Sequence, residues 1–299
     1  MHRHLTQRLW IFVAFCTLIS GAALADSSAA PRGKLPAGVT PSSYSLTLEI
    51  DPRKTDFSGV ADIQIKLDRS ASLIWLHGRD LKVSKVSVRA GSREIPARYT
   101  AVDTRTGVSR LDASAEIPAG SATLHFEYTG KIGSSAEGLY RVQVDKNWYV
   151  YSQMEPIDAR RVFPSFDEPG FKTPFDITVI SPKEDKVVSN TFPTRSTASG
   201  AGSKHEFERT LPLPTYLLAF AVGPLDIVAA PPIPPNALRK TPLPFRGVSP
   251  QGQGAKLDYA LRYSPEFVTR LESYLGAPFP YQKLDLIASP NMPGDEPIS

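Results

Sequence analysis

Apolar and polar residues alternate along most of the chain between positions 44 and 222. Tyr44–Ile50 and Phe57–Leu67 show this period of two, which predicts strands with one buried face. Similar runs recur at roughly the 8–12 residue spacing of sandwich folds. These runs cover residues 72–77, 83–88, 122–128, 148–152, 175–180, 187–188 and 216–222. The pattern predicts a mainly β protein with an antiparallel β-sandwich domain over residues 34–228.

The pattern changes after this domain. Residues 229–240 are rich in proline and predict a stiff, extended linker. Residues 257–275 have apolar positions at helical spacing, with Pro265 in a first turn behind a Ser264 cap and Gly276 as the end. Residues 284–287 then predict a strand. One helix and one strand cannot bury a core of their own, so we expect residues 241–299 to be the start of a truncated second domain.

The first 25 residues have the features of a secretory signal peptide. Arg3 and Arg8 precede an apolar run, and Ala23-Leu24-Ala25 matches a small-x-small cleavage site. We therefore expect a secreted or periplasmic protein, with residues 26–33 as a flexible mature N-terminus. Cys16 is the only cysteine, so the mature chain has no thiol for a disulfide or a zinc site.

The charge balance gives no indication of a nucleic-acid or membrane partner. The net charge of the whole chain is +4, and removing the signal peptide lowers it to +2. The remaining charges are dispersed along the chain, whereas nucleic-acid-binding proteins gather theirs in patches. We expect neither nucleic-acid nor membrane-surface binding after cleavage.

Polar chemistry is concentrated in the segment that follows the strand at residues 148–152. On a continuing strand, Gln153 and Glu155 would share one face and could accept hydrogen bonds from a ligand ammonium group. The alternative is that Glu155 pairs with Arg160 or Arg161 and only fixes the loop. The spacing alone favours this structural interpretation, because ion-pair networks commonly resemble sites.

A second acidic group follows at Asp167-Glu168-Pro169. Acidic residues before a proline favour a rigid corner, where they can accept hydrogen bonds from backbone amides. We interpret Asp167 and Glu168 as structural support for the site, with Arg160 and Arg161 holding the corner.

The chain shows no catalytic apparatus of its own. After the predicted cleavage site its histidines are His77, His125 and His205, and none has another histidine four residues away. A His-Glu-x-x-His zinc helix is therefore missing, as are a phosphate-binding loop and a Gly-x-Ser-x-Gly elbow. We assign no catalytic residue and no metal ligand within these 299 residues.

A series of motifs, in order, resembles the aminopeptidase N family of zinc metallopeptidases. The resemblance extends over nearly the whole mature chain, to about residue 290. It implies a saddle-shaped N-terminal β-domain followed by a thermolysin-like catalytic domain that binds zinc. It also implies that Gln153 and Glu155 bind the free N-terminal amine of a peptide substrate. The matching segments include Leu35-Pro36, Phe57-x-Gly59, Gly138-Leu139-Tyr140, Gln153-Met154-Glu155-Pro156, Ala159-Arg160, Phe163-Pro164, Asp167-Glu168-Pro169, Ser189-Asn190 and Tyr281-x-Lys283-Leu284-Asp285.

The sequence departs from the family pattern after Pro290. The family continues with a Gly-x-Met-Glu-Asn strand and then the zinc helix, whereas this chain reads Asn291-Met292-Pro293-Gly294-Asp295. Our leading hypothesis is the N-terminal part of a secreted zinc aminopeptidase that is inactive alone. The alternatives are a non-catalytic peptide-binding protein on the same β-domain, or a relative with epoxide-hydrolase activity.

Overall fold

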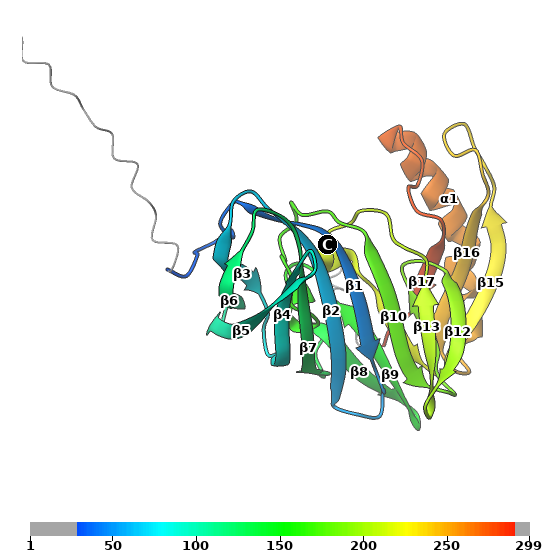
Figure 1. Cartoon of the computed structure of the whole chain (residues 1–299). Coiled ribbons are helices and arrows are strands. Elements are labelled where there is room, and N and C mark those ends of the chain that lie inside the picture. The colour runs from blue at the N-terminus through cyan, green and yellow to red at the C-terminus, as the bar shows by residue number, and fades with distance from the viewer. Residues whose placement is uncertain (1–28, 291–299) are drawn as a thin grey trace, which may run out of the picture.

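Three packed β-sheets form most of the computed structural model, which describes residues 29–290 (Figure 1). The first and largest sheet has ten strands in the order β12-β13-β10-β1-β2-β7-β4-β5-β6-β3. Adjacent strands in this sheet are antiparallel, except for β1 and β10, which are parallel. The strands are β1 (Val39–Glu49), β2 (Asp56–Leu67), β3 (Ala71–His77), β4 (Lys82–Ala90), β5 (Arg93–Asp103), β6 (Val108–Ile117), β7 (Gly120–Lys131), β10 (Phe175–Pro182), β12 (Pro193–Ser199) and β13 (Gly202–Phe207).

A four-stranded sheet, in the order β11-β14-β9-β8, is apolar on both faces. On one face Val150, Phe220 and Val222 join the core formed with the ten-stranded sheet. On the other face Tyr149 and Tyr151 pack in a second core. Successive side chains of a strand point to opposite faces, so this sheet is the middle layer. Its strands are β8 (Gly138–Val144), β9 (Asn147–Gln153), β11 (Lys186–Ser189) and β14 (Phe220–Gly223).

The third sheet has the order β15-β16-β17 and packs on the second core through Leu225, Val248 and Ile287. It lies with helix α1 at the end of the molecule next to β12 and β13 (Figure 1). Strand β17 runs parallel to β16. These elements are β15 (Leu225–Ile233), β16 (Leu243–Pro250), α1 (Asp258–Leu275) and β17 (Leu284–Ile287); the short 3₁₀ helices are η1 (Ala159–Arg161), η2 (Thr215–Leu217) and η3 (Gly254–Leu257).

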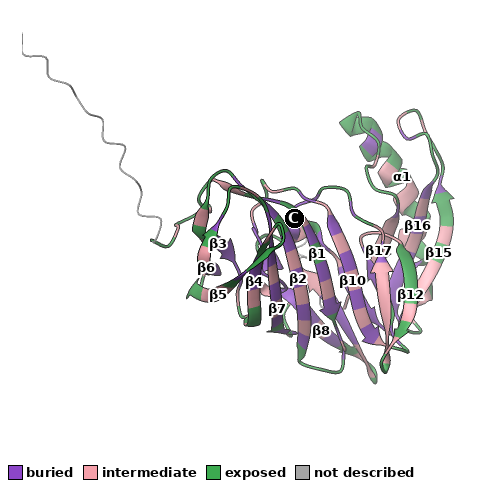
Figure 2. Ribbon diagram, in the orientation of Figure 1, coloured by how far each residue is buried: buried purple, intermediate pink, exposed green. Residues whose placement is uncertain are grey.

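The mainly β fold that alternation predicts is confirmed. Buried and more exposed positions alternate along β1, β2 and β10 (Figure 2). Tyr44, Leu46 and Leu48 of β1 are buried, as expected for one face of a strand. Gly59 also lies at a close contact, because a Cβ there would approach the Tyr128 ring to 2.4 Å.

The predicted proline-rich linker at 229–240 is wrong. Its first residues belong to β15, which pairs with β16 as an edge strand. Pro231 and Pro232 fall where the register shifts, between Ala230 and Ile233. Proline lacks the N–H that a regular ladder needs, so an edge strand with a bulge accommodates both residues.

The rest of this segment is fixed against helix α1 by a buried ion pair. Arg239 and Glu272 are 6% and 3% exposed, and Arg239 Nε lies 2.8 Å from Glu272 Oε1. The Arg239 guanidinium also donates to the carbonyl oxygens of Ile233, Pro234 and Thr241. The segment is therefore a folded connection.

The predicted start of the helix also needs correction. Helix α1 begins at Asp258 and Pro265 lies inside it. Leu257, buried in η3, packs over Gly247 of β16, where a Cβ would meet its side chain at 2.7 Å. This contact fixes the chain before the proline is reached. Gly276 ends the helix in the left-handed conformation, as predicted.

Helix α1 leaves most of its apolar side chains in solvent. Tyr259, Phe267 and Tyr274 are 75%, 64% and 87% exposed. Among the residues of α1, only Glu272 is buried. The helix presents a large apolar surface that residues 29–290 do not cover.

We predict that Glu272→Ala destabilises the chain by about 3–5 kcal/mol, because it leaves the buried Arg239 without its partner. It should also make the segment between β15 and β16 sensitive to proteases. Denaturant unfolding and limited proteolysis measure the two effects. Glu266→Ala is the control, since Glu266 pairs with Arg270 in solvent, and we expect a loss below about 1 kcal/mol. Equal losses for the two variants would contradict this account.

Candidate functional site

Gln153 and Glu155 lie at one end of the middle sheet. Gln153 is the last residue of β9, is half-buried, and pairs with Gly138 of β8. Glu155 comes two residues later, in a turn, and is exposed. Met154 between them is buried. The expectation that a continuing strand places both side chains on one face is wrong, because β9 ends at Gln153. Both residues lie at the same end of the middle sheet, two residues apart along the chain, and we call this end the site edge.

Strand pairing brings two further segments to this edge. Tyr151 of β9 pairs with Ala221 of β14, and Phe220 of β14 pairs with Ser189 of β11. Continuing the register places Ala219 between Gln153 and Asn190. The Asn190 side chain accepts a hydrogen bond from the Ala219 N–H at 2.9 Å and donates to the Leu217 carbonyl at 2.8 Å. Asn190 therefore fixes the backbone next to Gln153.

The site edge faces the third sheet. Gln153 follows the alternation of Tyr149 and Tyr151, whose side chains pack in the second core with Ile287. The hydroxyl of Tyr140 in β8 lies 2.9 Å from Ser289 Oγ, two residues beyond β17. The chain after β17 therefore crosses the same face of the middle sheet that carries Gln153.

Glu155 makes no hydrogen bond or ion pair through its side chain with any residue between 29 and 290. Both arginines that the sequence offered as partners contact other acids. Arg160 pairs with Asp167, and Arg161 pairs with Asp158, Asp80 and Glu137. The structure therefore does not show the ion-pair alternative for Glu155. The binding role of Gln153 and Glu155 stays a prediction.

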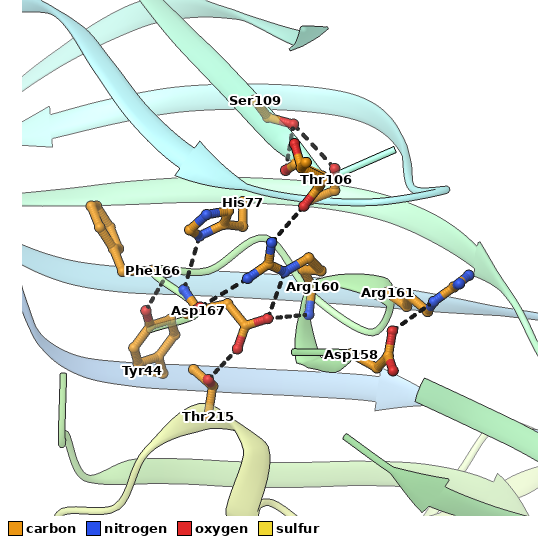
Figure 3. Close-up of polar contacts among 12 residues, drawn as sticks. Tyr44, His77, Thr106, Ser109, Asp158, Arg160, Arg161, Phe166, Asp167 and Thr215 are labelled. Carbon is orange, nitrogen blue, oxygen red and sulfur yellow. Dashed lines mark hydrogen bonds and ion pairs between the residues drawn. The ribbon is translucent and has the colours of Figure 1, made fainter. Parts of the chain in front are cut away.

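A buried ion pair supports the loop that follows β9 (Figure 3). Arg160 Nε lies 2.8 Å from Asp167 Oδ2, and the two side chains are 7% and 2% exposed. Arg160 Nη2 donates to the Asp167 carbonyl at 2.9 Å, and Nη1 donates to the Thr106 carbonyl. The hydroxyl of Thr215 donates to the other oxygen of Asp167. This network joins η1, η2 and the β5–β6 turn.

His77 extends the network toward the ten-stranded sheet. The backbone N–H of Asp167 donates to His77 Nδ1 at 3.2 Å (Figure 3). Burial, together with the positive charge of Arg160, lowers the pKa of His77 to about 3. His77 is therefore neutral at pH 7, as its role of hydrogen-bond acceptor requires. It is a packed residue of the network and stays outside the candidate binding edge.

The other two residues expected to support the site, Glu168 and Arg161, contact different parts of the chain. Glu168 accepts a hydrogen bond from the backbone N–H of Leu35 and so holds the N-terminal segment. Arg161 contacts acids outside the Asp167-Glu168-Pro169 corner, at distances of 2.7 to 2.9 Å. The expectation that both arginines hold this corner is therefore met only by Arg160.

Lys283 and Asn190 are site-edge residues to which the sequence interpretation gave no role. Their motifs, Ser189-Asn190 and Lys283-Leu284-Asp285, were noted only as family matches. Lys283 Nζ donates to the Ser189 carbonyl at 2.6 Å, which joins β17 to the end of β11. The sequence shows only a lysine directly before the predicted strand at 284–287, and the burial of that lysine is seen only in the structure.

The described residues do not form a metal centre. Between residues 29 and 290, no group of three or more His, Cys, Asp or Glu side chains could hold a metal ion. In that same range no helix has the length and apolar character needed to span a membrane. The predicted signal peptide at 1–25, residues 26–28 of the predicted flexible N-terminus, and the sequence after Pro290 lie outside the described residues.

We predict that Asp167→Asn destabilises the fold by about 3–5 kcal/mol, because Arg160 is then buried without its counter-charge. Denaturant unfolding measures this loss. Asp176→Asn serves as the control, since Asp176 pairs with Arg209 in solvent and should contribute less than about 1 kcal/mol. A small loss for Asp167→Asn would show that the buried pair does not support the site.

We also predict that His77 makes the chain acid-sensitive. Its pKa is about 3 in the folded state, against the ordinary histidine value of 6.5 in the unfolded chain, so the unfolded state binds more protons between these two pH values. Stability is then fully present above pH 6.5 and falls as the pH drops, by about 1.4 kcal/mol per unit.

The comparison between wild type and His77→Asn isolates this effect. Burial raises the pKa of Asp185 to about 6 from 3.8, so Asp185 acts in the opposite direction within that window in both proteins. We expect the variant to lose less stability between pH 6.5 and 4, as measured by urea unfolding at each pH. Parallel pH profiles would exclude His77 as the titrating group.

Comparison with known proteins agrees with the fold and the motifs. The sequence pattern of the peptidase M1 N-terminal domain matches residues 40–217. Aminopeptidase N of Acetobacter pasteurianus is 28% identical over 288 residues, which cover 92% of this chain and 78% of that protein. Aminopeptidase M1-D of Oryza sativa subsp. japonica is 28% identical over 275 residues, 90% of this chain and 30% of the relative.

A mammalian aminopeptidase has the same level of identity to this chain. Glutamyl aminopeptidase of Bos taurus is 28% identical over 270 residues, covering 86% of this chain and 27% of its own length. The chain therefore spans less than a third of the rice and bovine relatives. The match to the family pattern extends over more than half of the 299 residues. The chain belongs to the peptidase M1 family and contains its N-terminal β-domain.

Proposed function

We propose that this chain is the substrate-anchoring N-terminal part of a secreted zinc aminopeptidase, which removes N-terminal amino acids from peptides. The observation that carries the proposal is the carboxylate of Glu155. It is exposed in the turn after β9, two residues beyond Gln153, and has no ion-pair partner between residues 29 and 290. An unpaired carboxylate and a carboxamide at one edge are suitable acceptors for a peptide ammonium group.

This arrangement favours peptides with a free N-terminus. A charge-assisted hydrogen bond contributes about 1.5–3 kcal/mol. An acetylated peptide has no ammonium group, so its binding would leave the carboxylate unpaired, and sites built for a polar group reject analogues that lack it. The proposed partner is therefore a peptide with a free α-amine.

The rest of the enzyme would come from sequence beyond the described residues. The rice and bovine aminopeptidases are more than three times as long as the matched region. The exposed Tyr259, Phe267 and Tyr274 of α1 form an apolar surface that the rest of the enzyme would cover. Zinc, which the family resemblance implies, has no fitting ligand set between residues 29 and 290. The proposal therefore gives these residues substrate binding alone, and we expect no hydrolysis by this chain.

A non-catalytic peptide-binding protein on the same β-domain would use the same edge. The apolar surface of α1 disfavours this alternative, because monomeric soluble proteins rarely expose contiguous apolar patches of more than a few hundred Å². Secretion rests on the sequence pattern of residues 1–25 and remains part of the proposal.

The test is calorimetric binding of tetra-alanine with a free amine and of its N-acetyl counterpart to the purified chain at pH 7. We expect preference for the free amine, and a loss of about tenfold or more in Glu155→Gln, because one charge-assisted hydrogen bond is removed. Glu137→Gln is the matched control. Glu137 precedes Gly138, the partner of Gln153, but its carboxylate is bound to Arg161.

Two results would contradict the proposal. Equal affinity for the two peptides, or no effect of Glu155→Gln, would remove the anchoring role. Stoichiometric zinc and cleavage of an amino-acid arylamide by this chain would show that it is an enzyme by itself.

A further inference from the structure

A small pocket lies on the face of the middle sheet that is turned toward the third sheet. Its volume is about 210 Å³, and Asn190 and Ala219 belong to its wall. These residues come two positions from Val188 and Ala221, which pack in the second core, so alternation puts all four side chains on that face. Continued register places Ala219 beside Gln153, roughly 5 Å away at one interstrand spacing. The pocket therefore begins one strand from the proposed amine anchor.

Most of the pocket wall is apolar. It is formed by Leu213, Leu217, Tyr281, Leu284 and Ile287. Leu217 and Tyr281 are 41% and 38% exposed, so part of this apolar wall is in contact with solvent. A ligand group that covers it removes apolar area from water, which is favourable if the group is itself apolar.

The amide and charged groups of the wall already have partners. The side-chain oxygen and nitrogen of Asn190 both bond to backbone groups. Asp285 accepts two hydrogen bonds from Arg246 and contacts Lys283, which also donates to a backbone carbonyl. Ser189 turns its side chain to the opposite face, because it alternates with Asn190. A polar ligand group would lose water here without gaining a partner of its own, which costs free energy.

We propose that this pocket holds the first side chain of a bound peptide and selects a medium-sized apolar residue such as leucine. The inference rests on the proposed amine anchor at Gln153 and Glu155, because the first side chain is attached to the carbon that carries the amine. The pocket is smaller than the roughly 300–1,000 Å³ of drug-sized sites. It therefore suits a single side chain and not a longer segment.

An acidic first side chain is the competing occupant. Arg246 and Lys283 share Asp285 as their one carboxylate among residues 29–290. Both cations lie over the ring of Phe192, at 5.6 and 5.7 Å from its centroid, and Arg246 is partly exposed to solvent. The ring and the solvent stabilise these charges, so the apolar wall favours leucine over glutamate.

The test compares free-amine tetrapeptides that differ only in the first residue, titrated calorimetrically into the full chain at pH 7. The peptides are tetra-alanine and its counterparts with leucine, serine or glutamate in first place. We expect the leucine peptide to bind about tenfold or more tighter than tetra-alanine, because apolar pockets discriminate by that much for an added methylene. The serine and glutamate peptides should gain nothing over tetra-alanine.

Two variants change the pocket itself. Ala219→Leu should remove the preference for the leucine peptide, because the new side chain fills the space. Leu217→Ala should lower that preference about threefold or more, because apolar wall is lost. Leu211→Ala is the matched control, since Leu211 is also an exposed leucine, at 50%, but does not line the pocket. The two leucine variants keep the test decisive even if Ala219→Leu does not fold.

Methyl NMR gives a readout that does not need the peptide amine. The N-acetylated leucine peptide should shift the methyl signals of Leu217 and leave those of Leu211 in place. N-acetyl tetra-alanine at the same concentration should shift neither.

Three results would overturn the inference. They are equal affinity of the free-amine leucine and alanine peptides, tighter binding of the glutamate peptide than of the leucine peptide, or equal effects of Leu217→Ala and Leu211→Ala. Equal affinity of each free peptide and its acetylated form would instead contradict the amine anchor, while a shift of the Leu217 methyl signals would still report the pocket.

Discussion

The buried pair of Arg160 and Asp167 determines how the loop between β9 and β10 is held. The guanidinium reaches the β5–β6 turn through the Thr106 carbonyl, and the carboxylate accepts the hydroxyl of Thr215 in η2. Segments far apart in sequence therefore meet at one charge pair. Such a pair costs desolvation and contributes little net stability compared with apolar packing. Its value is positional, because the loop must bring the two charges together for each to be satisfied.

The packing of the middle sheet determines the position of the site edge. Both of its faces are apolar, so it must be covered on both sides, by the ten-stranded sheet and by β15–β17. A sheet covered on both faces can still present side chains where its strands end. Gln153 and Asn190 lie at such ends, and Glu155 follows in the turn after β9. The packing that fixes these strands also fixes the site edge.

Much of this architecture could be predicted from sequence, and the exceptions have physical causes. Alternation identified β1, β2 and β10, where one face is strictly buried. Among the strands that it missed, β5 and β12 have side chains that are largely exposed or half-buried, so they have no apolar period. The proline-rich stretch suggested a linker, because composition does not reveal that an edge strand with a bulge can hold two prolines. Helix α1 was placed correctly, but not the start of its first turn, which depends on Leu257 packing over Gly247.

At the candidate site, too, residues within one segment could be predicted from sequence, whereas contacts between distant segments could not. Arg160, Asp167 and Glu155 were identifiable because they lie within fifteen residues of one another. Which acid pairs with which arginine depends on the positions of Thr106, Asp80 and Glu137, which come from other strands and turns.

The junction at Lys283 depends on still longer connections. Ser189 and Lys283 are 94 residues apart, and no sequence period relates them. Their contact joins the N-terminal β-domain to β17 through a charged group that solvent hardly reaches. Such a group tolerates burial only if its charge is compensated, and Asp285 is shared with Arg246. The end of the middle sheet is therefore linked to the third sheet through the Lys283 charge. A substitution that changes the charge near β17 should alter the position of Ser189 and of the neighbouring Asn190.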